Sequence, residues 1–199
     1  AGAILHYGLV APEESSIYKH NFRLRNQNFF SISHNKTESV SIMPGYGFEM
    51  KNSMFWSLYF GYNYENVFET IEISDDTEVP VGEYEFWSME GMLMTSMSRP
   101  FMTVLLMKAG PYFDGNRISL GLEPTWCVSP TVQLSAFYEY NRVNFPDRNQ
   151  DFLAHIIRLK TLFMFSTKFT ISAFIQYNSD EHNIISNFRL RYNPRGGDY

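Results

Sequence analysis

The stretch Thr131–Val143 reads TVQLSAFYEYNRV and decides the class of fold. Its even positions from Val132 to Tyr140 are apolar or aromatic, whereas Gln133 and Glu139 among the odd positions are polar. A period of two is typical of a β-strand that presents unlike faces to two different environments. The stretch therefore predicts a strand with one apolar face and one polar face.

The same alternation recurs along most of the chain and predicts eleven strand segments and no amphipathic helix. The run 101–113 is apolar at both parities, so its register stays open. The expected segments are 3–10, 17–32, 39–50, 56–65, 87–98, 101–113, 117–126, 131–143, 153–165, 169–178 and 184–192.

Composition limits the class of protein. The 199 residues fit one domain, 1–199, and 19% of them are charged, below the roughly 25% of ordinary soluble domains. No apolar run approaches the ~18 residues of a membrane-spanning helix. The net charge of −5 argues against a nucleic-acid partner. Two candidates remain: a soluble all-β domain and a membrane β-barrel.

The connections between the segments favour the barrel. Short turns at 51–53, 98–100, 129–130 and 166–168 alternate with connections at 67–83, 114–116, 145–151 and 179–183, most of which are longer and more polar. Antiparallel up-and-down transmembrane barrels typically have short turns at one end and longer loops at the other. We therefore predict an all-β transmembrane β-barrel with at least eleven strands.

Aromatic side chains make up 17% of the chain, and many lie at the ends of the apolar faces. This placement resembles the two aromatic girdles that flank the apolar band of a membrane barrel. The alternative is that these aromatics pack in the core of a soluble domain, because aromatic residues favour strands in general. The predicted lipid-facing girdle comprises Trp56, Tyr62, Tyr64, Trp87, Phe101, Trp126, Tyr138, Tyr140, Phe165, Phe169, Tyr177 and Tyr192.

If the apolar face meets lipid, the polar face lines the lumen. Acidic strands precede basic ones, so we expect opposite charges to pair or to be hydrated. The charges would orient solutes in an open pore, or form a structural network in a narrow or plugged barrel. The predicted lumen-lining charges are Glu49, Glu65, Glu90, Glu123, Glu139, Arg158, Lys160, Arg189 and Arg191.

One loop carries the acidity of the whole chain, since the net charge of −5 would be +1 without its six carboxylates. Carboxylates suit calcium, but their spacing matches no calcium-loop motif, so a solvated outer loop is the simpler interpretation. Alternation at 70–73 suggests a β-ribbon projecting beyond the membrane. The acidic outer loop comprises Glu69, Glu72, Asp75, Asp76, Glu78 and Glu83.

Motifs for catalysis or cofactors are not found. The five histidines are scattered, no nucleophile elbow or glycine-rich phosphate loop occurs, and Cys127 is the one cysteine. We expect no enzyme activity, no cofactor and no metal. Cys127, beside Trp126 at a strand end, is interpreted as a small packed residue.

The C-terminal stretch Phe165–Arg195, FSTKFTISAFIQYNSDEHNIISNFRLRYNPR, resembles the C-terminal β-barrel of a family of Bacteroidota outer-membrane proteins of unassigned function. That family joins an N-terminal domain like a family 9 carbohydrate-binding module to the barrel. The resemblance implies an outer-membrane or cell-surface role and supplies no catalytic residues. It also implies that 193–198 form a turn before a further strand. With strand parity, this predicts about fourteen to sixteen strands in a longer protein.

The expected function is that of an outer-membrane module of a larger surface protein, or of a subunit of an outer-membrane complex, in a Gram-negative bacterium. Its partners would be outer-membrane lipid, lipopolysaccharide and other surface proteins, with no nucleic acid. A porin-like diffusion channel is the alternative within the same fold. A soluble ligand-binding β-barrel is the alternative of another class, and it would turn its apolar face inward.

Overall fold

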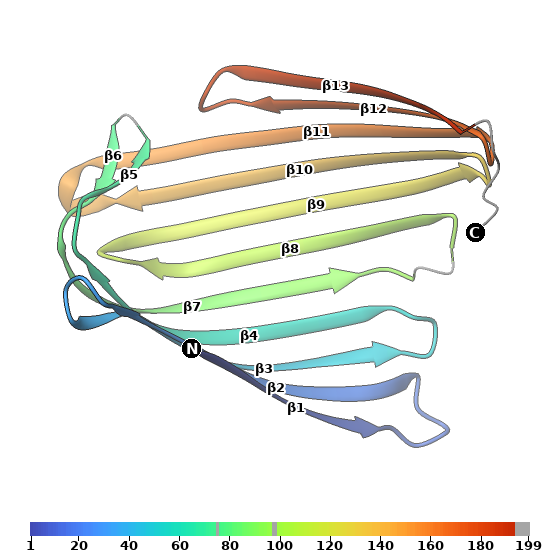
Figure 1. The fold of residues 1–199 in the computed structure, drawn as a ribbon. Coiled ribbons are helices and arrows are strands. Elements are labelled where there is room, and N and C mark those ends of the chain that lie inside the picture. Colours follow the sequence, from blue (N-terminus) through green and yellow to red (C-terminus); the bar gives the residue numbers. More distant parts are fainter. Residues whose placement is uncertain (75, 97–98, 194–199) are drawn as a thin grey trace.

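The computed structural model describes residues 1–74, 76–96 and 99–193. Eleven strands lie side by side in one antiparallel sheet, in the order β1-β2-β3-β4-β7-β8-β9-β10-β11-β12-β13 (Figure 1). Each strand pairs with its neighbour in the chain, except that β4 pairs with β7 and the small hairpin β5–β6 lies between them in sequence. The all-β class, the eleven segments and the up-and-down antiparallel order are confirmed.

The strands are longer than the alternation alone predicts, and several extend into segments expected to be loops. Their bounds are β1 Gly2–Val10, β2 Ile17–Ser31, β3 Lys36–Met50, β4 Phe55–Val67, β5 Ile71–Ser74, β6 Thr77–Val79, β7 Gly82–Met94, β8 Phe101–Tyr112, β9 Gly115–Ser129, β10 Val132–Phe145, β11 Gln150–Ser166, β12 Phe169–Asn178 and β13 Asn183–Tyr192.

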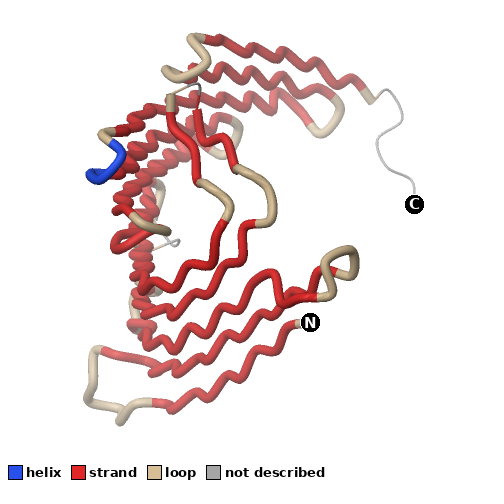
Figure 2. Tube along the Cα trace, turned by 90° about the vertical axis from the view of Figure 1, so that its left-hand side faces the viewer, coloured by secondary structure: helices blue, strands red, loops and turns tan. Residues whose placement is uncertain are grey.

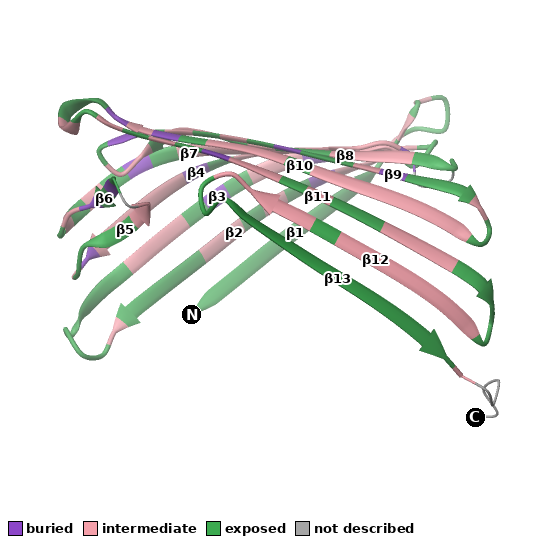
Figure 3. Ribbon diagram, turned by 90° about the horizontal axis from the view of Figure 1, so that it is seen from above, coloured by how far each residue is buried: buried purple, intermediate pink, exposed green. Residues whose placement is uncertain are grey.

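The sheet curls into a trough and does not close (Figure 2). Among the described residues, β1 and β13 are the two free edges, and every residue of both strands is exposed (Figure 3). Closure needs the two edges to meet in register, because only then are all strand N–H and C=O groups paired. The eleven described strands form an open, curved wall, so the predicted transmembrane barrel is not confirmed.

The connections alternate between the two ends of the trough as predicted. The hairpin end carries 32–35, 68–81, 113–114, 146–149 and 179–182, and the turn end carries 11–16, 51–54, 95–100, 130–131 and 167–168 (Figure 1). The predicted difference in length holds only in part. Connections 146–149 and 179–182 are longer than 130–131 and 167–168, and 68–81 is much longer, but 11–16 exceeds most connections of the hairpin end. The differences are smaller than predicted because β-pairing extends into the polar segments.

Helical structure in the described part of the chain is limited to one 3-10 turn, Pro146–Arg148. No helix among the described residues is long and apolar enough to cross a membrane. The predicted turn at 193–198 lies almost entirely outside the described part of the chain.

Candidate functional site: a polar trough with an apolar outer face

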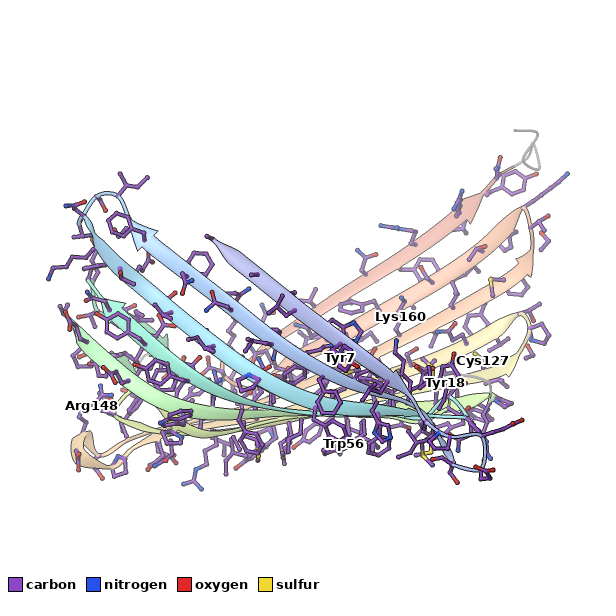
Figure 4. The ribbon with its side chains drawn as sticks, turned by 90° about the horizontal axis from the view of Figure 1, so that it is seen from below. Tyr7, Tyr18, Trp56, Cys127, Arg148 and Lys160 are labelled. Atoms are coloured by element: carbon purple, nitrogen blue, oxygen red, sulfur yellow. The ribbon has the colours of Figure 1, made fainter. Side chains whose placement is uncertain are left out.

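Alternation along the strands gives the sheet two faces of different chemistry. Arg25 of β2 and Glu90 of β7 pair over two intervening strands, which side chains can do only on the concave side. Positions of the opposite parity therefore face outward. Figure 4 shows Trp56 on the convex side of the sheet and Lys160 within the trough.

The convex face is apolar over most of its area and is open to the surroundings. Leu122 of β9 lies between Leu105 of β8 and Tyr138 of β10 on this face. Leu159 is 51% exposed and Trp87 is 64% exposed, although both are large apolar side chains. Pairing with β9 also resolves the register of β8: Leu105 faces outward, and Leu106 faces the trough.

All twelve predicted girdle aromatics lie on the convex face. Trp87, Tyr138 and Tyr140 lie farther from the strand ends than predicted, because β7 and β10 extend to Gly82 and Phe145. On β7 and β10 these aromatics still mark the border of the apolar band, since the convex positions beyond them, Glu85 and Arg142, carry charge.

The charged border is visible in two places. Glu85 lies opposite Tyr64, one step beyond the contact between Tyr62 and Trp87, whose ring centroids are 5.4 Å apart. On β10 and β11, Arg142 Nε donates to Asp151 Oδ1 at 3.1 Å. From Val132 to Tyr140 the convex positions of β10 are apolar, a length that matches the ~9–11 residues of a tilted membrane strand.

The concave face carries all nine charges predicted for the lumen, together with five cations that the prediction missed. Arg23 and Arg25 alternate with apolar residues on β2, so period-two reasoning could have found them. Lys108 was hidden by the open register of β8. The missed cations are Lys19, Arg23, Arg25, Lys108 and Arg117.

Glu90 is the centre of the ion pairs on the concave face. Its carboxylate lies 2.8 Å from Arg25 Nη2 and 3.3 Å from Lys108 Nζ. The Arg25 guanidinium also lies over the Tyr59 ring, 4.2 Å from its centroid. Gly45 leaves room for that ring, because a Cβ there would lie 2.1 Å from Tyr59 Cδ1.

The expected pairing between acidic and basic strands holds only for Glu90, and its partners are among the cations that were missed. Among the described residues, no ion pair joins Glu123 or Glu139 to Arg158 or Lys160. Arg158 lies across Phe137 from Glu123, and its guanidinium is directed to Gln176 and the Phe137 ring instead.

A groove of about 430 Å³ opens on the concave face between β9 and β12. Arg158 Nε donates to Gln176 Oε1 at 3.1 Å, and its guanidinium lies 4.8 Å from the centroid of the Phe137 ring and 5.9 Å from that of Phe174. Lys160 lies two residues along β11 and lines the same groove. Two cations and two aromatic rings thus share one wall.

The acidic loop forms the predicted β-ribbon, but the ribbon does not project outward. The hairpin β5–β6 lies across the concave side of the hairpin end (Figure 2). Its Val79 is fully buried in a cluster with Val67, Val143 and Phe145. Thr77 and Val79 form a buried face of the hairpin, so burial of apolar area draws it into the trough.

Arg148 fastens the hairpin to the neighbouring loops. Its guanidinium donates to the Glu78 carbonyl, pairs with Asp114 at 2.7 Å and lies 4.0 Å from the centroid of the Phe145 ring. At the base of the loop, Phe68 stacks on His34 with ring centroids 4.0 Å apart. The hairpin end of the trough therefore holds a small apolar cluster, and the carboxylates of Glu72, Asp76 and Glu78 line open space beside it.

The six predicted loop carboxylates are spread over the hairpin and its flanks, and Asp75 lies outside the described residues. Glu72 and Glu78 lie directly opposite each other in the β5–β6 ladder. Nowhere in the described part of the chain do three His, Cys, Asp or Glu side chains gather to hold a metal ion. Cys127, interpreted as packed, is exposed, because the end of β9 has no layer above it.

No family model, curated protein or solved structure matches this chain.

Proposed function

We propose that this chain forms part of the wall of an outer-membrane β-barrel, as the membrane module of a larger surface protein or as a subunit of an outer-membrane complex. Its partners would be outer-membrane lipid and lipopolysaccharide on the convex face and other surface proteins at the strand ends. The resemblance of 165–195 to Bacteroidota barrel proteins points to the same role. One observation carries the proposal: the apolar face of the sheet is the convex face.

The direction of curvature weighs against the soluble alternative. A soluble barrel gains stability by enclosing its apolar face, and it leaves the polar face in water. Here the trough encloses Glu90, Arg158 and Lys160, whereas Leu159 and Ile157 of the same strand lie on the outside. Exposed apolar surface of this extent is stable only when lipid or another protein covers it.

A diffusion channel is the second candidate, and the polar concave face favours it. The hairpin across one end of the trough favours a structural module instead, because it occupies the path that a solute would take. Planar-bilayer recordings separate the two, since a stable conductance would support the channel and its absence would remove that candidate.

The membrane proposal is tested by single cysteines at positions 157 to 160, built on a Cys127→Ser background. With the protein reconstituted in bilayers, a water-soluble thiol reagent should label 158 and 160 from the trough and leave 157 and 159 protected by lipid. The same four variants unfolded in urea provide the control, in which all should react equally.

Strong labelling of 157 and 159 in bilayers would contradict a lipid-facing convex surface. A monodisperse, detergent-free preparation of the folded chain would do the same, since the convex apolar face would then have to be covered by protein.

A further inference from the structure

We infer that the groove between β9 and β12 binds small organic anions, in which a carboxylate or phosphate is joined to an apolar ring. The inference goes beyond the proposed membrane function and does not depend on it, because the groove lies on the concave face. It is carried by the juxtaposition of Arg158 and Lys160 with Phe137 and Phe174.

The two cations are available to a ligand. Arg158 uses its Nε for Gln176, and among the described residues no hydrogen bond or ion pair engages its terminal nitrogens or the Lys160 ammonium. The side chains point to one side of β11 about 6.5–7 Å apart, the repeat of two residues along a strand. An oxyanion between them can accept charge-assisted hydrogen bonds from both.

The guanidinium is also held in place before any ligand arrives. Phe137 lies opposite Arg158 on β10, and Phe174 lies opposite Lys160 on β12, so a ring lies on each side of the basic strand. The rings and the bond to Gln176 limit the rotamers of Arg158, which reduces the entropy lost on binding. The same rings offer an apolar surface to the body of the ligand.

The rest of the groove wall is mostly polar. Thr125 Oγ1 donates to Ser135 Oγ at 3.3 Å, and Gln133 and Glu123 line the same side. Met102 of β8 and Ala136 are the apolar residues of this part of the wall. Glu123 provides an acceptor for a hydroxyl or ammonium group of the ligand. The groove therefore favours an anion that also carries a polar group over a purely apolar one.

The charge on the concave side of the eleven-stranded sheet has the same sign. Its strands carry the four predicted and five missed cations and five carboxylates, a net charge of +4 that does not include the acidic β5–β6 hairpin at one end of the trough. Such a field raises the local concentration of anions over cations. Glu90 is engaged by Arg25 and Lys108, whereas among the described residues Arg158 and Lys160 form no ion pair with Glu123 or any other carboxylate.

The test uses fluorine NMR on the full chain in a neutral detergent, or in buffer if the chain proves soluble. The probes are para-fluorobenzoate and para-fluorophenyl phosphate, with para-fluorobenzyl alcohol as the neutral control. We expect line broadening of the two anions but not of the alcohol. We expect Arg158→Gln to weaken binding about ten-fold, as loss of a charge-assisted hydrogen bond predicts.

Two further variants keep the test decisive. Lys160 is exposed, so Lys160→Gln should fold normally and weaken binding about three-fold. Arg117→Gln is the matched control, because Arg117 is also a concave cation over a ring, 4.3 Å from the Tyr112 centroid, but lies outside the groove.

If Arg117→Gln weakened anion binding as much as Arg158→Gln, binding would reflect the positive charge of the concave face and not the groove. If the signal of the alcohol broadened as much as those of the anions, the groove would have no preference for anions. Binding of only one of the two anions would support the groove and would identify whether it prefers a carboxylate or a phosphate. The cysteine-labelling result stands apart from all of these, so failure of the membrane proposal and failure of the groove are distinguishable.

Discussion

Leu159 and Lys160 are adjacent in sequence but belong to different environments, and substitutions there should have opposite consequences. Leu159→Arg should destabilise the folded chain in bilayers by about 2–4 kcal/mol, because a basic side chain on the lipid face near the midplane loses its hydration. Lys160→Leu should fold with little penalty, since the trough tolerates either side chain. Urea titration of both variants in lipid vesicles measures the difference, and equal losses would refute the assignment of faces.

Gly110 is the one glycine among the described residues with a positive φ, +131°, a conformation that L side chains rarely adopt. A Cβ there would lie 2.9 Å from the Trp87 carbonyl oxygen of the neighbouring strand. Gly110→Ala should therefore cost about 1–3 kcal/mol in unfolding free energy. Gly121→Ala is the control, because its Cβ would meet Leu106 Cβ at an ordinary 3.4 Å. Similar denaturation midpoints for the two variants would disprove the strain argument.

The β5–β6 hairpin should be separable from the sheet by a single buried charge. Val79→Asp places an unpaired carboxylate in the cluster of Val67, Val143 and Phe145, and desolvation of that charge costs more than the hairpin can offset. Hydrogen exchange of 71–79 should accelerate at least about ten-fold while the eleven strands keep their protection.

Val81→Asp is the matched substitution for the hairpin, because Val81 is 61% exposed and its carboxylate would remain hydrated. Exchange in 71–79 should then stay slow. If Val79→Asp also deprotected β4 and β10, the hairpin would be an integral part of the sheet and not a separate element.

Period-two alternation is sufficient to predict the number and the faces of the long strands, because each strand lies between two unlike environments. Their antiparallel order follows from the short connections between them. Alternation could not place β8, which is apolar at both parities, and the structure does so only through the pairing of Leu105 with Leu122. It also missed the apolar cluster at the hairpin end. Val79 and Phe145 lie far apart in sequence, and no local pattern shows that they meet.

The sequence predicts the face of some groove residues but not the groove itself. Glu123, Arg158 and Lys160 were assigned to the polar face from parity alone, which is a local property. Phe137 and Phe174 were not, because they are apolar residues at polar positions of their strands, and only the strand register reveals them beside Arg158. Sequence patterns give the face of a residue, whereas its neighbours depend on register.

At the scale of the whole molecule, the proposal predicts heat-modifiable migration. The chain refolded in detergent should migrate differently in an SDS gel before and after boiling, because cross-strand hydrogen bonds shielded from water persist in SDS until heated. A sample taken directly from urea provides the control and should migrate as the boiled form. Identical migration of all three samples, with strand-rich circular dichroism lost in SDS, would count against a membrane wall.

Nearest-neighbour pairing of the strands also bears on how the sheet comes into being. Most strands are joined to their partner by a connection of two to six residues, so closing each loop costs little entropy and no strand waits for a distant one. Assembly can advance one hairpin at a time, with each completed strand serving as the template for the next. Pairing of β7 with β4 is the slowest step of such an assembly, because the connection 68–81 places fourteen residues between the two strands.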